Sequence, residues 1–232
     1  MKSITGFILY IDILGYKNLL RNNTQSENER VKSLLESFTS IYTNLNFALG
    51  FGASFEESKL FKRYFSDNFL FVYKSEREAF LNLLIIQSIA SQIQSQFLYC
   101  GMLTRGSITY GTIDYSDDIV YGVDLIKAVE LESHPEPSVV VDEDLKDVLI
   151  KNDFEYKEHN SLFFVHGDSE LDFQDVKNGI EKYLVELNKT SPDQKTINKI
   201  NWVVEQMNDY CSSTMHHYSL AVNSKVKLVC DN

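Results

Sequence analysis

The sequence predicts an α+β fold in which a mixed, mainly antiparallel sheet carries helices on one face. Residues 7–13, 59–74 and 103–113 are rich in β-branched, aromatic and aliphatic residues, as strands are. Residues 79–97 and 123–131 instead repeat apolar residues at helical spacing. Since 44% of the 232 residues are apolar, with 15 Phe and 13 Tyr among them, the chain has ample material for a core.

The first strand is predicted over residues 7–13. Alternation places Phe7, Leu9 and Ile11 on one face and Ile8, Tyr10 and Asp12 on the other. An amphipathic helix of about four turns is expected over residues 31–45. The stretches 59–65 and 69–74 predict a hairpin with Ser66-Asp67-Asn68 as its turn, and a helix over 79–97 follows.

The next part of the chain continues the mixture of strands and helices. The expected elements are a strand at 103–113, a helix at 123–131, a short buried strand at 139–141, a helix at 143–151 and strands near 154–157 and 162–166. Asp142 is a candidate N-cap for the fourth of these elements. In its first part, this order resembles a ferredoxin-like sheet, whose second face is available to a substrate or a second subunit.

The chain changes character from about Phe173, after which only helical patterns remain. Apolar stripes over 176–187 and 197–210 predict a helical hairpin. No linker rich in Pro, Gly or Ser separates it from the preceding part. We therefore expect one domain over residues 1–170 and a helical extension packed on it over residues 171–232.

Composition limits the classes of function. A formal net charge of −11 argues against a nucleic-acid binder, whose affinity comes from neutralising phosphates, but leaves a nucleotide substrate possible. Three cysteines without a CxxC pair predict neither a disulfide framework nor a zinc site. The first residues lead directly into a strand, with the pattern of neither a signal peptide nor a membrane span. A cytoplasmic protein without a membrane partner is expected.

Two aspartates, Asp12 and Asp67, stand where apolar strands meet turns. Burying a carboxylate there costs several kcal/mol unless a partner offsets its charge. Two such residues in similar settings indicate a shared divalent cation, Mg²⁺ or Mn²⁺, of the kind that phosphoryl and nucleotidyl transfer require. The alternatives are a strand-end cap for Asp12 and an ordinary turn residue for Asp67.

A third segment, residues 103–113, holds Arg105 between strand residues with glycines at 106 and 111. Glycines inside a strand indicate close approach of backbone or ligand. Alternation places Arg105 on the same face as Ser107, and this face is the one with the aspartates if Ile108 faces the helices. An arginine there suits a phosphate, because its planar fork binds two oxygens. The alternative is an ion pair with a carboxylate.

From about Phe7 to Val165 these motifs resemble the class III nucleotidyl cyclases. The stretch from Asp12 to Tyr16 is similar to their first metal motif, Ser66-Asp67 to the second, and Arg105 to Gly111 loosely to their "R-x-G-I-x-x-G" strand. Gly122, Ala128 and Glu132 match the helix that follows. The resemblance implies that residues 1–170 form a cyclase catalytic domain.

The resemblance also implies a two-metal site. Asp12 and Asp67 would ligate two Mg²⁺ or Mn²⁺ ions, with the backbone carbonyl of Ile13 as a further ligand. One ion would activate the ribose 3′-hydroxyl and the other would hold the triphosphate. The products would be a 3′,5′-cyclic nucleotide and pyrophosphate, and the site would form between two subunits of a homodimer.

The chain departs from the purine cyclases at the positions that select base and phosphate. Ile126 and Glu130 stand where those enzymes carry Asn and Arg, and Arg63 stands at the base-selecting lysine. The motifs are more similar to the pyrimidine cyclases of Pycsar anti-phage systems, which implies UTP or CTP as substrate. The product would activate a separate effector, and Arg105 would stabilise phosphate.

Further nucleotide contacts are expected from Lys17, Arg63 and Tyr64. Lys17 opens the first helix, where backbone amides favour phosphate. Arg63 and Tyr64 are adjacent in a strand, so alternation gives only one of them to the nucleotide face. Two other functions stay open: a catalytically silent, cyclase-like nucleotide-binding domain, which Glu130 favours, and a cyclase that uses ATP or GTP.

Overall fold

The computed structural model describes residues 1–16, 55–99, 102–153 and 194–214, with the single positions 29, 32, 178 and 181. The strands are β1 (Lys2–Ile13), β2 (Leu60–Phe65), β3 (Asn68–Lys74), β4 (Thr104–Tyr115), β5 (Val120–Tyr121) and β6 (Val139–Val141). The helices are α4 (Phe80–Tyr99), α5 (Val123–Glu132), α6 (Lys146–Lys151) and α8 (Gln194–Thr214), with the short 3-10 turns η2 (Glu57–Lys59) and η3 (Glu143–Leu145).

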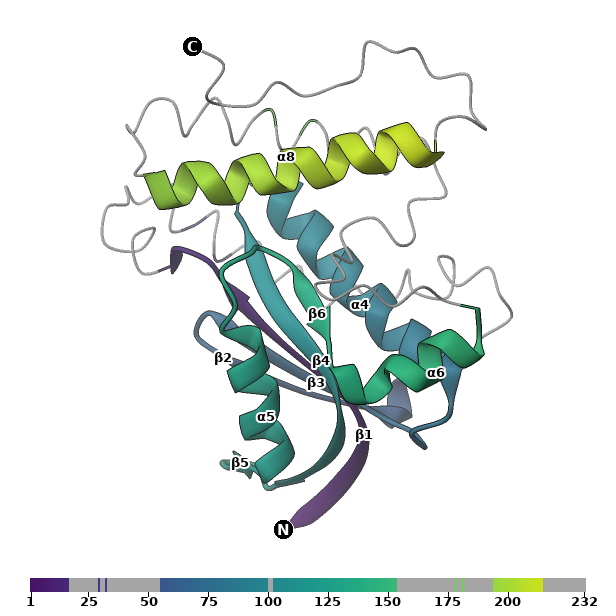
Figure 1. Cartoon of the computed structure of the whole chain (residues 1–232). Helices are drawn as coiled ribbons and strands as arrows, with labels where there is room; N and C mark the ends of the chain where they lie inside the picture. The colour runs from purple at the N-terminus through teal and green to yellow at the C-terminus, as the bar shows by residue number, and fades with distance from the viewer. Residues whose placement is uncertain are drawn as a thin grey trace.

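The described strands form one sheet of six, in the order β2-β3-β1-β4-β5, with β6 beside β4 (Figure 1). Every neighbouring pair is antiparallel except β4 and β6, which run parallel on either side of the crossover through α5. The predicted α+β class with a mixed, mainly antiparallel sheet is thereby confirmed.

The central strand β1 distributes its side chains as alternation predicts. Phe7 and Leu9 join the core cluster that contains Ile86 and other residues of α4. Ile8 lies in a second cluster, on the opposite face, together with Ala128 of α5. The two faces of the sheet are therefore both buried, one under α4 and the other, in part, under α5.

The sequence predicted helices on one face of the sheet. Helix α5 instead packs on the face opposite α4. Gly111 of β4 permits the close approach of α5, since a Cβ atom there would lie 2.2 Å from Cγ of Asp124. The Asp124 carboxylate also accepts a hydrogen bond of 2.7 Å from the Thr112 N–H. These contacts fix the start of α5 on the face that the sequence left open.

The β2–β3 hairpin forms as predicted, with a tighter turn. Asn68 belongs to β3 and pairs with Phe65, so Ser66 and Asp67 alone make the turn. Ser66 has a φ of 59°, which the two-residue turns of hairpins require at their first position. The shorter turn brings Asp67 next to the end of β1.

The predictions for the remaining described elements are largely confirmed. Asp142 caps η3, since its carboxylate accepts the Asp144 N–H at 3.2 Å, and η3 with α6 covers the helix predicted over 143–151. The two-residue strand β5 was not predicted, because it is too short for any periodicity. The predictions at 31–45, 154–157, 162–166 and 176–187 fall outside the described residues.

The C-terminal helix α8 occupies the stretch predicted over 197–210. Its apolar stripe is buried through Ile200, Val203 and Val204. Figure 1 shows α8 crossing the end of the molecule where α4 ends. The hairpin partner of α8 and the division into residues 1–170 and 171–232 stay predictions. Among the residues that the structure describes, no helix has the length and apolar character to cross a bilayer.

Candidate functional site

Asp12 is the penultimate residue of β1 and lies between two neighbouring strands. It pairs in register with Asn68 of β3 and Arg105 of β4. Residues that pair across antiparallel strands project to the same face. Asp12 and Arg105 therefore share one face, as alternation predicts. This face carries α5, where the sequence predicted no helix. The Asp12 side chain is 17% exposed, so it is close to solvent but largely enclosed.

Asp67 lies beside the end of β1, because the Ile13 N–H donates to the Asp67 carbonyl at 3.0 Å. Its carboxylate accepts a hydrogen bond of 3.3 Å from the Asn68 amide. The Asn68 side-chain oxygen in turn accepts the Tyr10 hydroxyl at 2.7 Å. This Tyr10–Asn68–Asp67 chain orients the carboxylate. Sequence reasoning missed the roles of Tyr10 and Asn68, although Asn68 follows directly after Asp67.

The Tyr10 phenol lies close to both aspartates. The pKa of Tyr10 is raised to about 12, mainly by burial and then, in order of size, by the negative charges of Glu132, Asp12 and Asp67. Tyr10 therefore stays protonated and remains a hydrogen-bond donor over the physiological range. Each of the three carboxylates therefore lies near enough to the Tyr10 hydroxyl to act on it through its charge.

Arg105 contacts two carboxylates and a carbonyl, and these residues are here called the Arg105 cluster. Its Nε lies 2.5 Å from Oε1 of Glu132, and its Nη2 lies 3.6 Å from Oδ2 of Asp12. Its Nη1 donates to the His134 carbonyl at 3.0 Å. The ion pair that the sequence left as an alternative is therefore present, and the phosphate role of Arg105 stays a prediction.

Glu132 is the last residue of α5, and its side chain is only 6% exposed. Burial raises the pKa of Glu132, the neighbouring Arg105 charge opposes this, and the Asp12 charge adds to it. Glu132 was not among the residues that the sequence predicted for the site. A signal was present, because Leu125, Ala128 and Glu132 follow one another at helical spacing, which puts an acid on an apolar stripe.

Arg63 and Tyr64 lie on opposite faces, as strand alternation predicts. Arg63 pairs with Leu70 on the α5 face, and its guanidinium donates to the Ser116 carbonyl at 3.0 Å, toward the β4–β5 turn. The Tyr64 ring packs edge-on against Phe69 on the α4 face, with centroids 5.6 Å apart. The structure thus places Arg63 on the face of Asp12 and Tyr64 on the other. Lys17 falls outside the described residues.

Helix α5 presents an outward surface without an available cation. Ile126 is 58% exposed and Glu130 is also exposed, so the positions that carry Asn and Arg in purine cyclases are apolar and acidic here. Lys127 is the one basic residue of α5, and its ammonium lies 2.5 Å from Asp142 and also contacts Asp144. No positive charge from this helix reaches toward the aspartates.

The donor set at Asp12 and Asp67 fits a small hard cation that arrives with a substrate. Mg²⁺ is commonly held by one or two carboxylates and completed by waters and phosphate oxygens. Asp12, Asp67 and the Ile13 backbone offer oxygen ligands of that kind. Among the described residues, no group of three or more His, Cys, Asp or Glu side chains is arranged to hold a metal ion.

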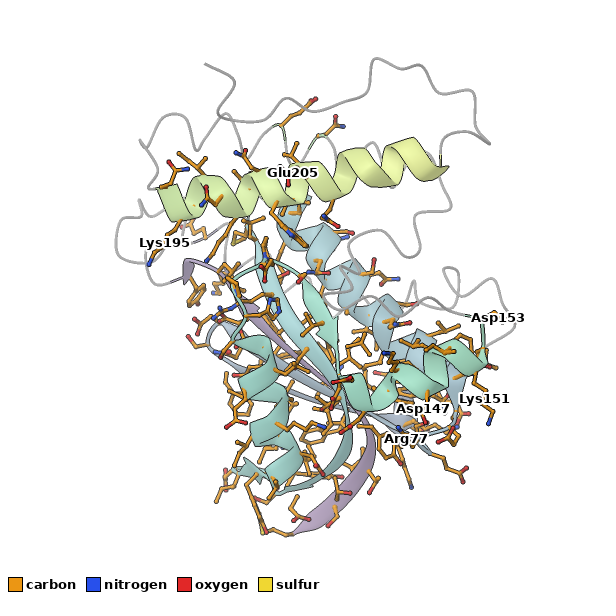
Figure 2. The ribbon with its side chains drawn as sticks, viewed as in Figure 1. Arg77, Asp147, Lys151, Asp153, Lys195 and Glu205 are labelled. Carbon is orange, nitrogen blue, oxygen red and sulfur yellow. The ribbon has the colours of Figure 1, made fainter. Side chains whose placement is uncertain are left out.

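A second charged surface lies along η3 and α6 and is here called the Arg77 cluster. Its Arg77 guanidinium donates to both carboxylate oxygens of Asp147, at 2.8 and 3.0 Å, and to the Asp144 carbonyl. An open cavity of about 720 Å³ is lined by Arg77, Glu143, Asp144, Lys146, Asp147, Ile150 and Lys151. Figure 2 shows Arg77, Asp147 and Lys151 together along α6. None of the predicted site residues that the structure describes lines this cavity.

Comparisons with known proteins concern the arrangement of strands and helices. No family model and no curated protein matches the sequence. The catalytic core of a rhodopsin-guanylyl cyclase with converted specificity, in complex with ATPalphaS, matches at a TM-score of 0.44 and 11% identity, over 64% of this chain and 82% of that chain. A class III adenylyl cyclase-like ATP-binding protein from Pseudomonas aeruginosa matches at a TM-score of 0.43 and 11% identity. The second match covers 81% of this chain and 44% of that protein.

Proposed function

We propose that this protein is a metal-dependent nucleotidyl cyclase that converts UTP or CTP to the 3′,5′-cyclic monophosphate and pyrophosphate. The observation that carries the proposal is the placement of Asp12 and Asp67 at the ends of hydrogen-bonded strands, around the same Tyr10 hydroxyl. Arg105 lies across the strand from Asp12. Two acids and a planar cation at one end of the central strands match what the sequence motifs imply.

In this proposal each residue has a defined task. Asp12, Asp67 and the Ile13 carbonyl hold two Mg²⁺ or Mn²⁺ ions, which when bound lower the pKa of the ribose 3′-hydroxyl and offset the triphosphate charge. Arg105 binds a phosphate oxygen through its Nη2, the nitrogen nearest Asp12. The Tyr10–Asn68 pair keeps the Asp67 carboxylate in one orientation.

The pyrimidine substrate rests on the sequence motifs and on what is absent from α5. Ile126 and Glu130 offer neither the amide nor the guanidinium of purine cyclases. The resemblance to Pycsar enzymes extends the proposal to anti-phage signalling, in which the cyclic product activates a separate effector. Arg63 and Lys17 remain proposed nucleotide contacts. Tyr64 is a proposed contact only if its ring leaves the α4 face.

Product identification tests the proposed function. The purified chain is incubated with Mn²⁺ and each of the four nucleoside triphosphates, and the products are separated by chromatography and identified by mass spectrometry. A cyclic pyrimidine nucleotide is expected, and its formation should be lost in Asp12→Ala. A cyclic purine product would reassign the base, and no cyclic product from any of the four would refute the cyclase.

A second function, a nucleotide-binding domain without turnover, is favoured by one observation. Arg105 is engaged by Glu132 and by the His134 carbonyl, so its cation is already partly neutralised before any phosphate binds. Isothermal titration calorimetry separates the two functions. A silent domain binds a triphosphate and returns it unchanged, whereas a cyclase consumes it in the presence of Mn²⁺.

The proposed enzyme is a homodimer, as the resemblance implies. The surface of α5 offers a contact, because Val123 is 81% exposed and Ile126 is 58% exposed. Large apolar side chains in adjacent exposed positions are common in interfaces between subunits. The chain has a mass of 26.8 kDa, and sedimentation at micromolar concentration should give twice this mass. Val123→Asp should lower the sedimenting mass toward that of a monomer.

A further inference from the structure

At the candidate site the Arg105 guanidinium pairs with two carboxylates, and one of them is closer than the other. Arg105 lies 2.5 Å from Glu132 but 3.6 Å from Asp12, both measured between the closest nitrogen and oxygen. The interaction of opposite charges strengthens as the distance falls. Arg105 therefore pairs more strongly with Glu132 than with Asp12.

The position of the guanidinium is set by the end of α5. Glu132 is buried, and α5 is attached to β4 by the Ser107 hydroxyl, which donates to the Ala128 carbonyl at 2.6 Å. The His134 carbonyl, just beyond the helix, accepts from Nη1 of Arg105 at 3.0 Å. Two of the three guanidinium nitrogens are thus held by a rigid element, and the third is turned to Asp12.

We propose that Glu132 is a positioning residue that holds Arg105 at α5 and thereby preserves the affinity of Asp12 for a divalent cation. The inference rests on the proposed function, because it concerns the metal site assigned there. A guanidinium and a metal ion compete for the same carboxylate. By pairing with Arg105, Glu132 weakens the interaction of Arg105 with Asp12. The Arg105 Nη2 still lies where a phosphate is proposed to bind.

The expected consequence of removing the Glu132 charge is tighter pairing between Arg105 and Asp12. Glu132→Gln keeps the size and one acceptor oxygen of the side chain, so the packing at the end of α5 is retained. The guanidinium then has one remaining carboxylate in contact, that of Asp12. Changes beside metal ligands commonly lower metal affinity by about 10- to 100-fold, and we expect about tenfold here.

Binding of Mn²⁺ alone, followed by the electron paramagnetic resonance of the free ion, measures this directly. No nucleotide is present, so turnover does not enter the measurement. Glu132→Gln should bind Mn²⁺ about tenfold more weakly than the wild type. Glu130→Gln is the matched control, because it removes the same charge from an exposed position of the same helix. Equal affinity of the two variants would overturn the proposal.

A double-mutant cycle with Arg105→Gln shows whether Glu132 acts through the arginine. Once Arg105 is absent, adding Glu132→Gln should change Mn²⁺ affinity by less than about twofold. A tenfold loss in that background would mean that Glu132 acts on the ion itself, and would overturn the positioning role. Thermal denaturation checks that each variant is folded.

Two further variants keep the result decisive. If Glu132→Gln does not fold, Arg105→Gln alone still tests the competition, and it should bind Mn²⁺ at least as tightly as the wild type. Weaker binding by Arg105→Gln would overturn the proposal. Asp12→Asn should abolish the binding that Glu132→Gln weakens. If Asp12→Asn has no effect, the proposed metal site fails as well, whereas failure of the Glu132 effect alone leaves that site intact.

Discussion

The Arg105 and Arg77 clusters use the same kinds of side chain with opposite consequences for the pKa. In the exposed Arg77 cluster, the pKa of Asp147 is lowered by its hydrogen bond to Arg77, and the pKa of Asp144 is lowered by its hydrogen bond to Lys127. In the Arg105 cluster, burial raises the pKa of Glu132 despite the adjacent guanidinium.

This difference distinguishes charged groups that stabilise the fold from charged groups that belong to the candidate site. Where pairing lowers the pKa of a carboxyl, folding favours the charged form and gains stability from it. Where burial raises the pKa, the charged form is disfavoured, and such groups gather at functional sites. The contrast predicts that the same substitution has different effects in the two clusters.

The largest expected effect is on turnover. Asp12→Asn or Asp67→Asn should lower the rate of cyclic nucleotide formation by more than about 100-fold, because each removes an anionic ligand of the proposed ions. Asp147→Asn, in the Arg77 cluster, should leave that rate within about twofold. Rates are measured by chromatography of the product at saturating Mn²⁺. Similar losses from Asp147→Asn would abolish the distinction between the clusters.

The next effect is expected from the Tyr10–Asn68–Asp67 chain. Asn68→Ala removes the hydrogen bond to the Asp67 carboxylate, and Tyr10→Phe removes the one that orients the Asn68 amide. Each should raise the Mn²⁺ concentration for half-maximal activity by about tenfold, with Asn68→Ala the larger. Loss of maximal rate without any change in that concentration would argue against an orienting role.

A smaller effect concerns stability and pH. The pKa of Glu132 is raised above its ordinary value of 4.5 in the folded state, so the folded protein binds more protons above that pH. Unfolding free energy should therefore fall as pH rises from about 4.5 through the folded pKa of Glu132. Glu132→Gln should flatten this slope in urea denaturation measured at successive pH values. An unchanged slope would contradict the assignment.

The carboxyls of the Arg77 cluster should behave in the opposite sense. Their pKa values are lowered from an ordinary 3.8, so the stability they contribute is present above that pH and lost as the pH falls through the lowered values. Asp147→Asn should reduce the acid dependence of unfolding below about pH 4. A reduced dependence near neutral pH instead would place the titrating group elsewhere.

The smallest effect is expected for Arg77→Gln. The Arg77 side chain is 35% exposed, and exposed ion pairs usually contribute about 1 kcal/mol or less. The two-oxygen contact with Asp147 places this pair near the upper end of that range. Urea denaturation at low and high salt measures it, and a loss above about 3 kcal/mol would show that the cluster is not merely a surface contact.

Much of the fold follows from periodicity in the sequence. Alternation along 7–13 assigned Phe7, Leu9 and Ile11 to one face of β1 and Ile8 and Tyr10 to the other, as the structure shows. The rule holds because this part of β1 is a regular strand. The same rule separated Arg63 from Tyr64. The placement of α5 on the second face could not be predicted, because it depends on the contact between Gly111 and Asp124, which only the folded chain brings together.

The sequence predicted that Asp12 and Arg105 lie together, but it did not predict the side chains that orient them. Asp12 and Arg105 were assigned to one face from alternation, and their registered pairing agrees with that. The contacts of Glu132 and Asn68 depend on how a helix end and a turn meet the strands, which strand alternation does not specify. An acid on an apolar helix stripe was the one local signal, and it pointed to Glu132.

We propose that Asp12 and Asp67 ligate the same two divalent ions. A crystal structure with Mn²⁺ and a non-reacting analogue of UTP, with the ions located by anomalous scattering at the manganese edge, tests it most directly. We expect manganese peaks about 2 Å from carboxylate oxygens of both residues, beside the triphosphate. Peaks at only one of the two aspartates, or in another part of the molecule, would contradict it.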